Sequence, residues 1–404
     1  PESSIVSGTR RHCYYPSSLR VRAMSCCWNR GAESLLPASR DSDFDRQVLI
    51  GFNRILDQGG VIRTSPATIQ RRTLAGALGL VAQFSSEHFG KKRSPGEGGI
   101  AQQVVVDAVS PDAFNFTKVN VAEKICEVEA LPEEHPAGPL RTTVLANVSP
   151  LATGHVLLVP QCEQVRPQVL TEELMLCGLH LLAKSGRKDF RLVFNSLLGF
   201  ASVNHFHFHG LYLSYCGLPS AQLPVERVDR SIIAGKTTEG CTQIELIVDK
   251  CWYCSGFVVS AGCKPGTPGE APPADIAALA AMVARVVQEL QRRNIPHNVI
   301  IAPPPTERKQ KKVFTGGMAH EEPVKPNAIS PEVFILPRKP ESELRTDAGF
   351  NAAVMEISGV LVAQSEEAYA AFEEGNLQEI FKSDVSLPDA DFDELICKVA
   401  WLPT

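Results

Sequence analysis

Residues 205–209 read His-Phe-His-Phe-His, and this alternation constrains the fold more than any other stretch of the chain. Successive side chains of a β-strand point to opposite faces, so we expect the three histidines on one face and the two phenylalanines on the other. The aromatic face belongs in a hydrophobic core. The imidazole face must line something polar, because burying unpaired polar groups costs free energy. The run therefore predicts a strand that joins a core to a polar site.

Three interpretations of the imidazole face, which consists of His205, His207 and His209, compete. A zinc site is disfavoured because the outer pair on a straight strand spans ~13 Å, whereas each Zn–N bond is only ~2 Å long. A histidine pair with a metal ligand from elsewhere stays open, and so does a simple solvated strand face. The favoured interpretation is nucleophilic catalysis at phosphorus. The middle imidazole attacks, while its neighbours fix its tautomer and contact phosphate oxygens.

The composition limits what the protein binds. A chain of 404 residues, 44% hydrophobic and 21% charged, can bury a large core. Its net charge of −5 provides no global basic field for nucleic acid, so an anionic substrate needs a local positive site. No apolar run approaches the ~20 residues of a membrane helix. Twelve scattered cysteines and the lack of a secretory signal predict reduced thiols in a cytoplasmic protein.

Three segments are expected along the chain: 1–43, 44–220 and 221–404. The first is rich in Arg and Ser and poor in acidic residues, which fits a transit peptide. A flexible tail, or translated sequence upstream of a start at Met24, is the preferred interpretation. The second and third segments are predicted to be two halves, the first with a helical lead-in and the second with C-terminal helices.

Periodicity places the elements of the two halves. We expect helices over 44–57, 66–77, 172–182 and 274–293, and strands over 114–119, 124–129, 142–148, 154–160, 190–196, 201–213, 242–250, 251–260, 297–303 and 332–339. The polar, Pro- and Gly-rich segment 304–327 is predicted to be a loop. Strands, a helix and further strands occur twice, which indicates an α+β fold of two related halves in one catalytic unit.

Two sequence blocks resemble a known superfamily. The stretch "SVNHFHFHGLYL" at 202–213, with "SPLATGHVLLVP" at 149–160, resembles the histidine-triad proteins, where a Gly-His strand ending at proline precedes a strand of alternating histidines. The serial order of further blocks, such as "FRLVFNS", "IPHNVIIAP" and "VFILPRK", resembles the GDP-D-glucose phosphorylases of that superfamily over about 80–360. The resemblance implies antiparallel sheets with packed helices.

The resemblance also implies an activity and its residues. GDP-glucose and inorganic phosphate would give GDP and glucose 1-phosphate through guanylylated His207, with His205 and His209 orienting it. Ser202 matches a phosphate-contacting serine, and Asn195 resembles an asparagine of the preceding strand. Neither a metal nor a cofactor is expected. Transferases of this superfamily often carry Gln at the third triad position, so a hydrolase that releases GMP stays an alternative, as does a non-catalytic nucleotide-binding protein.

Weaker candidates complete the site. Lys118 and Asn115 lie on a predicted strand and are candidates for phosphate and nucleotide contacts. Arg338 and Lys339 end another strand, where a cationic pair can hold the sugar phosphate or the incoming phosphate. Solvated charges are the alternative for these groups, and His155 is predicted to be a hydrogen-bonded core residue. The expected partners are GDP-glucose and phosphate, with neither nucleic acid nor a membrane, and no oligomeric state is predicted.

Overall fold

The computed structural model describes most of the chain beyond its first forty residues. The described ranges are 41–87, 102–107, 109–110, 112–131, 138–233, 242–248, 251–261, 275–305, 311–315, 318–322 and 330–402. Almost all of the predicted N-terminal segment 1–43 lies outside them. Within the described ranges, no helix is both long and apolar enough to cross a membrane.

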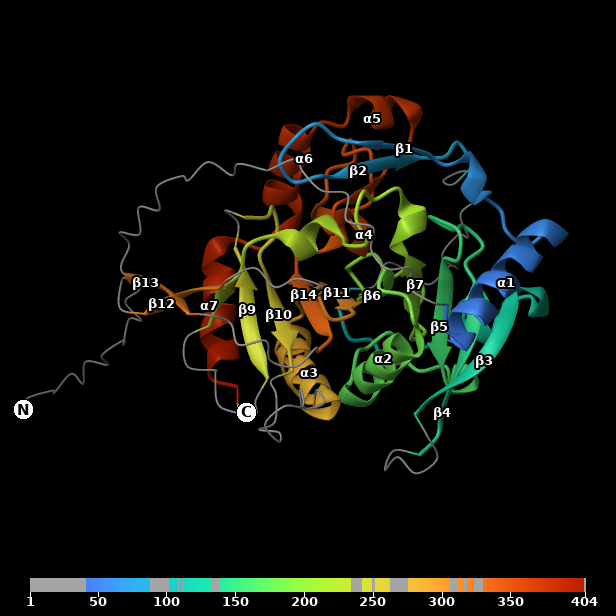
Figure 1. Ribbon diagram of the computed structural model, residues 1–404, viewed down its shortest axis with the longest axis horizontal. Coiled ribbons are helices and arrows are strands. Elements are labelled where there is room, and N and C mark those ends of the chain that lie inside the picture. The colour runs from blue at the N-terminus through green and yellow to red at the C-terminus, as the bar shows by residue number, and fades with distance from the viewer. Residues whose placement is uncertain are drawn as a thin grey trace, which may run out of the picture. The chain divides into compact units, whose positions relative to one another are not determined.

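A ten-stranded sheet runs through the described body (Figure 1). Every pair of neighbouring strands in it is antiparallel. Across the sheet the strands are β3 (Lys124–Leu131), β4 (Leu140–Ala146), β5 (Val156–Pro160), β7 (Phe208–Tyr212), β6 (Phe190–Asn195), β11 (His297–Ala302), β14 (Glu332–Pro337), β10 (Gly256–Ser260), β9 (Gln243–Ile247) and β8 (Ser231–Ile232).

The sheet is built from the same strand order twice. From its outer edge inward, the first five strands run β3-β4-β5-β7-β6, and the last five run β8-β9-β10-β14-β11. In each set a helix follows the third strand: α2 (Glu172–Lys184) follows β5, and α3 (Ile276–Arg292) follows β10. The sets meet where β6 pairs with β11, with Asn195 opposite Asn298. The α+β class with antiparallel sheets is confirmed, whereas the boundaries at 43 and 220 stay predictions.

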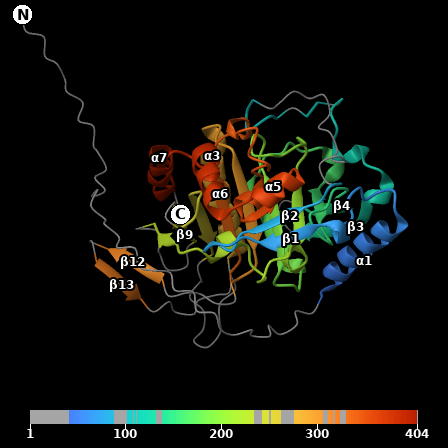
Figure 2. The ribbon, with the colours of Figure 1, turned by 90° about the horizontal axis from the view of Figure 1, so that it is seen from above.

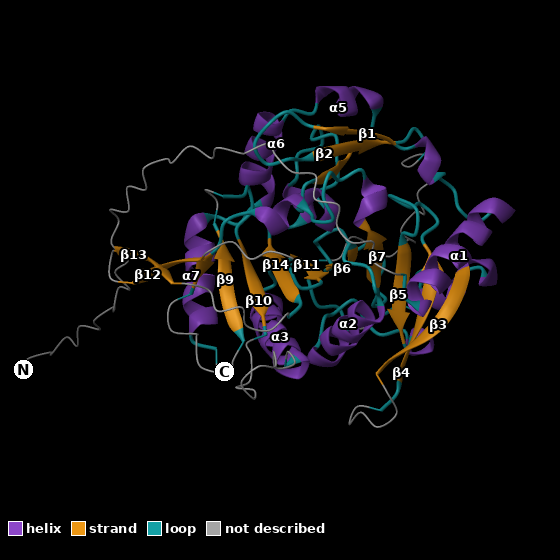
Figure 3. Ribbon diagram, in the orientation of Figure 1, coloured by secondary structure: helices purple, strands orange, loops and turns teal. Residues whose placement is uncertain are grey.

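Alternating side chains of the central strands enter two cores, one on each face of the sheet. On β6, Leu192 and Phe194 pack with the helices of one face, and Val193 packs with the opposite face. The first face is covered by α1 (Asp43–Gln58), α2, α3 and α7 (Asp389–Ala400) (Figures 1 and 2). The opposite face carries a small sheet and short helices, namely β1 (Gln70–Thr73), β2 (Val81–Phe84), β15 (Val360–Val362), α4 (Val354–Ile357), α5 (Glu366–Ala371) and α6 (Glu374–Ile380). Figure 3 shows β1, β2, α5 and α6 of this group.

Local sequence explains where α2 and α3 begin and how closely α2 packs on the sheet. The Thr171 side chain accepts from the backbone of Leu174 at the start of α2, and Asp275 caps α3 in the same way. Gly178 inside α2 has a packing reason. A Cβ there would lie 2.8 Å from Ile301 and 3.0 Å from Phe208, so only glycine lets this helix approach the sheet so closely.

Several predicted elements are wrong. Residues 66–77 form a 3-10 turn and strand β1 in place of a helix, and 114–119 contain a 3-10 turn in place of a strand. The predicted strands over 201–213 and 251–260 shrink to β7 and β10. The predicted loop 304–327 contains a hairpin of β12 (Lys311–Thr315) and β13 (Met318–Glu322). Periodicity over a few residues did not reveal the turns that shorten these strands.

Candidate active site

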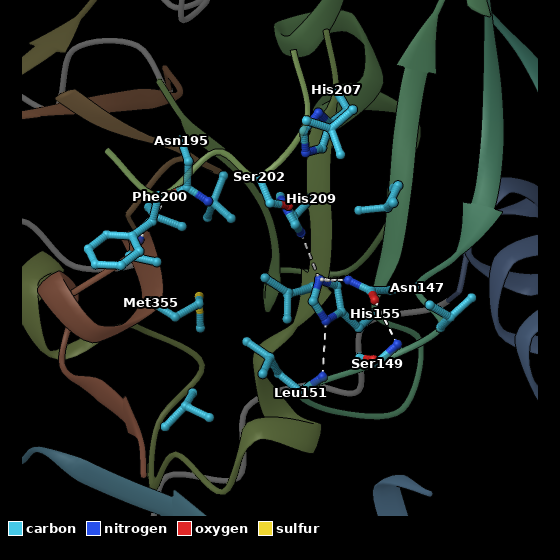
Figure 4. Close-up of a pocket in the computed structure, with 18 of the residues that line it drawn as sticks. Asn147, Ser149, Leu151, His155, Asn195, Phe200, Ser202, His207, His209 and Met355 are labelled. Atoms are coloured by element: carbon cyan, nitrogen blue, oxygen red, sulfur yellow. Dashed lines mark hydrogen bonds between the residues drawn. The ribbon is translucent and has the colours of Figure 1, made fainter. Parts of the chain in front are cut away.

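A cavity of about 180 Å³ opens on the sheet face opposite α2 and α3, beside β7. It takes residues from distant parts of the chain, which Figure 4 shows around a shared space. The lining side chains are Phe114, Phe116, Glu123, Ala146, Asn147, Val148, Ser149, Leu151, His155, Leu157, Val193, Asn195, Phe200, Ser202, Val203, His207, His209, Leu211, Asn351, Ala353, Val354, Met355, Glu356 and Val362. The cavity joins residues of both predicted halves.

The histidine run is only partly a strand. Phe206 and Phe208 are fully buried in the core beneath α2 and α3, which confirms the predicted aromatic face. Strand β7 begins only at Phe208, so the residues before it lie outside the ladder. His207 and His209 line the cavity, but His205 does not. That all three imidazoles share one face stays a prediction, and the rings of His205 and His207 both pack against Phe116.

His205 instead holds a neighbouring loop. Its Nδ1 accepts a hydrogen bond from the backbone N–H of Phe116 at 3.0 Å, which places the proton of the neutral ring on Nε2. That Nε2 is buried and has no hydrogen-bond partner in the described part of the chain. The Phe116 ring borders the cavity and lies 4.9 Å from the His207 ring, centroid to centroid. His205 thus orders one aromatic wall of the site.

His207 is held neutral with one ring nitrogen available. Its Nδ1 lies 2.8 Å from the carbonyl oxygen of His205, which can only accept, so Nδ1 carries the proton. Nε2 then has the lone pair, and no hydrogen bond engages it among the described residues. Burial lowers the pKa of His207 to about 4 from an ordinary value near 6.5. A neutral imidazole with a fixed tautomer is the form that attacks phosphorus.

A chain of hydrogen bonds also fixes the tautomer of His209. The backbone N–H of Leu151 donates to Nδ1 of His155 at 3.0 Å, so His155 carries its proton on Nε2. That Nε2 lies 3.0 Å from Nδ1 of His209, which must accept, and His209 therefore carries its own proton on Nε2 (Figure 4). The amide nitrogen of Asn147 also lies 3.2 Å from the Nε2 of His155, but two donors form no hydrogen bond. His155 is a hydrogen-bonded residue, as predicted, and one that lines the cavity.

Asn195 lines the cavity and has its side-chain oxygen fully engaged. Its Oδ1 accepts from the side chain of Asn298 at 2.7 Å and from the backbone N–H of Val354 at 2.9 Å. Both lone pairs of this oxygen are thus used, and the donor hydrogens of Nδ2 have no partner among the described residues. Asn195 and Ser202 both line the cavity, as expected for phosphate contacts. Their roles stay predictions.

The other predicted contacts lie outside the cavity lining. Asn115 caps the 3-10 turn at Phe116–Lys118, and its Oδ1 accepts from the backbone of Thr117. The exposed Lys118 donates to the carbonyl of Ala113 at 2.7 Å. Lys339 donates to the carbonyl of Ser383 at 2.7 Å. The structure thus assigns these side chains local structural roles and does not bring them to His207.

Arg338 is fully buried next to the site, without being part of its lining. Its guanidinium lies over the ring of Phe200 at 5.0 Å, donates to the backbone carbonyls of Lys339 and Ala352, and leaves Nη2 without a partner in the described chain. Burial lowers its pKa to about 10. Phe200, which does line the cavity, separates this cation from it.

Sequence reasoning missed several polar side chains of the lining, among them Glu123, Asn147 and Glu356. The lining includes neither Lys nor Arg, so in the described chain imidazole, amide and hydroxyl groups supply its polar side-chain donors. Nor do the described residues bring together three His, Cys, Asp or Glu side chains in a way that could hold a metal ion.

Two family models match the chain on either side of a gap. The model described as "GDPGP1-like, N-terminal domain" matches residues 43–211, and "GDPGP1-like, C-terminal domain" matches residues 270–401. Together they span most of the chain. The chain belongs to the GDPGP1-like family. The first match contains every histidine of the candidate site, and the second contains the α4 segment that closes the cavity.

Curated relatives agree with the GDPGP1-like assignment. The chain is 28% identical to human GDP-D-glucose phosphorylase 1 over 372 residues, which cover 91% of this chain and 86% of that one. It is 27% identical to GDP-L-galactose phosphorylase 1 of Arabidopsis thaliana over 347 residues, covering 84% and 69% of the two chains.

Among solved structures, yeast Ap4A phosphorylase Apa2 in complex with Ap4A superposes with a TM-score of 0.53 at 13% identity. The match covers 86% of this chain and 99% of that one. At this identity the likeness concerns the fold alone, and it supports the histidine-triad fold expected from the sequence.

Proposed function

We propose that this protein is a GDP-hexose phosphorylase, which transfers GMP from a GDP-hexose to inorganic phosphate. One observation carries the chemistry: His207 is buried and neutral, its Nδ1 proton is bound to a carbonyl, and its Nε2 is left for attack. Membership of the GDPGP1-like family and similarity to curated GDP-D-glucose and GDP-L-galactose phosphorylases support the substrate class. GDP-D-glucose is the proposed GDP-hexose substrate.

The proposed reaction is a double displacement. Nε2 of His207 attacks the α-phosphorus, and the bond to the bridging oxygen breaks, so that glucose 1-phosphate leaves with the electron pair. The guanylylated ring is cationic, and the His205 carbonyl that accepts its Nδ1–H stabilises that charge. An oxygen of inorganic phosphate then attacks the same phosphorus and the N–P bond breaks, which gives GDP and restores neutral His207. Splitting the transfer in this way predicts ping-pong kinetics.

His209, Asn195 and Ser202 are proposed to hold the phosphates. The hydrogen-bond chain from Leu151 through His155 supports an Nε2–H donor on His209, and the Nδ2 of Asn195 supplies another. Fixed donors aimed at phosphate oxygens stabilise charge without reorganising during the reaction. This arrangement replaces the cationic pair of Arg338 and Lys339 that the sequence suggested.

The two ends of the cavity suit the two ends of the substrate. Phe116 and Leu157 belong to a small apolar cluster that offers a surface for a base, and the lining residue Glu123 precedes Lys124, which pairs with Leu145 of this cluster. A carboxylate can accept from both N1–H and N2–H of guanine, whereas adenine presents an acceptor at N1. We propose that the base binds there and that the hexose hydroxyls meet Asn351 and Glu356 beside α4.

The substrate proposal is tested by product analysis. The protein is incubated with GDP-glucose or ADP-glucose, with and without inorganic phosphate, and products are identified by mass spectrometry. We expect GDP and glucose 1-phosphate from GDP-glucose, in amounts that require phosphate, and slower turnover of ADP-glucose. GMP formed regardless of phosphate would establish the hydrolase alternative, for which a third triad histidine is typical. Binding of GDP-glucose without any product would establish a non-catalytic binding protein.

A cytoplasmic location is part of the proposal. Cys177, Cys216 and Cys254 are buried thiols outside any disulfide, as is usual in a reducing compartment.

A further inference from the structure

The pairing between β6 and β7 stops two residues short of the nucleophile. The ladder runs from Phe190 opposite Tyr212 to Val193 opposite His209. Continued in the same register, it would place Asn195 directly opposite His207. These two residues are the proposed phosphate donor and the proposed nucleophile, so the opening of the ladder sets their separation.

The side-chain amide of Gln168 occupies this opening. Its Oε1 accepts from the backbone N–H of His207 at 2.9 Å. Its Nε2 donates to the backbone carbonyl of Asn195 at 2.9 Å and to that of His207 at 3.3 Å. Because N–H groups only donate and carbonyls only accept, the amide can bind in this orientation alone. A primary amide thus takes the place of a peptide unit of the missing ladder.

The amide is itself held firmly. Gln168 is 1% exposed, and its backbone N–H donates to the side chain of Asn204 at 2.8 Å. Two residues earlier, the carbonyl of Arg166 accepts from the backbone of Phe206 at 2.7 Å. The connector between β5 and α2 is therefore hydrogen-bonded to residues 204–207, here called the triad segment. The side chain of Gln168 also reaches β6. Nothing in the periodicity of either strand indicates this contact.

We propose that Gln168 is a positioning residue for the transfer reaction, which fixes the distance between the His207 backbone and Asn195 and so aims Nε2 at the α-phosphorus. The proposal rests on the proposed function of His207. Without the amide, the two strand ends lose their only described hydrogen bonds across the opening, and the imidazole moves relative to the donors that hold the phosphates. A misplacement of ~1 Å can lower the rate of a positioned reaction by about 100-fold.

Two substitutions at this position test the proposal against a matched control. Gln168→Met keeps the volume and removes all three hydrogen bonds. Gln168→Glu keeps the shape, but an ionised carboxylate cannot donate to the carbonyls, whereas the protonated acid can. The control is Gln291→Glu, because the Gln291 amide donates to the carbonyl of Leu170 in the same connector, away from the cavity.

The measurement is kcat and KM for GDP-glucose phosphorolysis between pH 5 and pH 8, with thermal melting of each variant. The titratable or charged groups on the segments bonded to Gln168 are His205, His207 and Arg166, which is ion-paired with Glu173. For Gln168→Met we expect kcat lower by about 100-fold, with KM within a few-fold of the wild type. For Gln168→Glu we expect the same loss at pH 8 and recovery of kcat as the pH falls. The control should follow the wild type throughout.

Each outcome decides something. Wild-type kcat in both Gln168 variants would overturn the proposal, as would a loss for Gln168→Glu that stays constant with pH or appears in KM alone. If Gln168→Met fails to fold, the pH profile of Gln168→Glu decides by itself. An inactive wild-type protein would overturn the proposed function, and an active wild type with unaffected variants would overturn only the role of Gln168.

Discussion

Replacing His207 by alanine is expected to lower the rate of GMP transfer by about 10⁴- to 10⁶-fold while the protein stays folded. The loss is large because the side chain forms the covalent bond, and no other described imidazole can replace it. The Nδ1 of His209 is engaged by His155, and His205 lies outside the cavity lining. The check is a single-turnover assay of glucose 1-phosphate release, with circular dichroism to verify the fold.

His297 provides a matched control. Like His207, it is buried, has its Nδ1 within hydrogen-bond distance of the carbonyl two residues earlier, and has a pKa lowered by burial to about 4. It does not line the cavity. The variant His297→Phe should therefore lose stability but keep its rate within a few-fold. An active His207→Ala variant, or equal inactivation by both substitutions, would contradict a covalent role for His207.

Acid is expected to destabilise the folded protein well before its carboxylates titrate. Burial lowers the pKa of His205, His207 and His297 to about 4, whereas the unfolded chain holds them near 6.5. Below pH 6.5 the unfolded state binds protons that the folded state excludes, so stability present above this pH is lost as the pH falls toward 4. From pH 8 to pH 5 each histidine should remove about 2 kcal/mol from the free energy of unfolding.

Urea unfolding at pH 8 and pH 5 measures this loss. The wild type should lose about 6 kcal/mol in total, and the variants His297→Phe and His207→Ala should each lose about 2 kcal/mol less. A pH-independent free energy of unfolding over this range would show that these imidazoles are not held neutral by burial. The neutral form is also the one that the chemistry of His207 requires, so the same shift links stability to function.

The sequence predicted those parts of the site that depend on residues close together in the chain. The alternation in residues 205–209 predicted the burial of Phe206 and Phe208 and indicated His207 as the candidate nucleophile. The shared face of His205 stays a prediction, because the pairing of β6 with β7 ends at Val193 and His209. Gln168, in the connector between β5 and α2, carries no periodic signal. Only tertiary contacts place its amide between β6 and the triad segment.

The charged candidates lie outside the cavity lining, also because of tertiary contacts. A cation at a strand end was expected to reach an anionic ligand, but β14 is an inner strand of the sheet, so Arg338 at its end is buried behind Phe200. Asn115 had a readable signal, since asparagine commonly caps a turn by accepting from the residue two places on. Glu123 and Glu356, which also line the cavity, had no such sequence signal. Their position depends on contacts between distant parts of the chain, which the sequence pattern does not predict.

The most direct test of the central claim is to capture the covalent intermediate. The protein is mixed with GDP-glucose in the absence of phosphate, quenched at alkaline pH, which preserves a phosphoramidate, and analysed by intact mass and peptide mapping. The expected result is a single GMP adduct located on His207, with a matching amount of glucose 1-phosphate, and discharge of the adduct as GDP when phosphate is added. An adduct on another residue, or phosphate-dependent formation of GDP without any adduct, would contradict catalysis by His207.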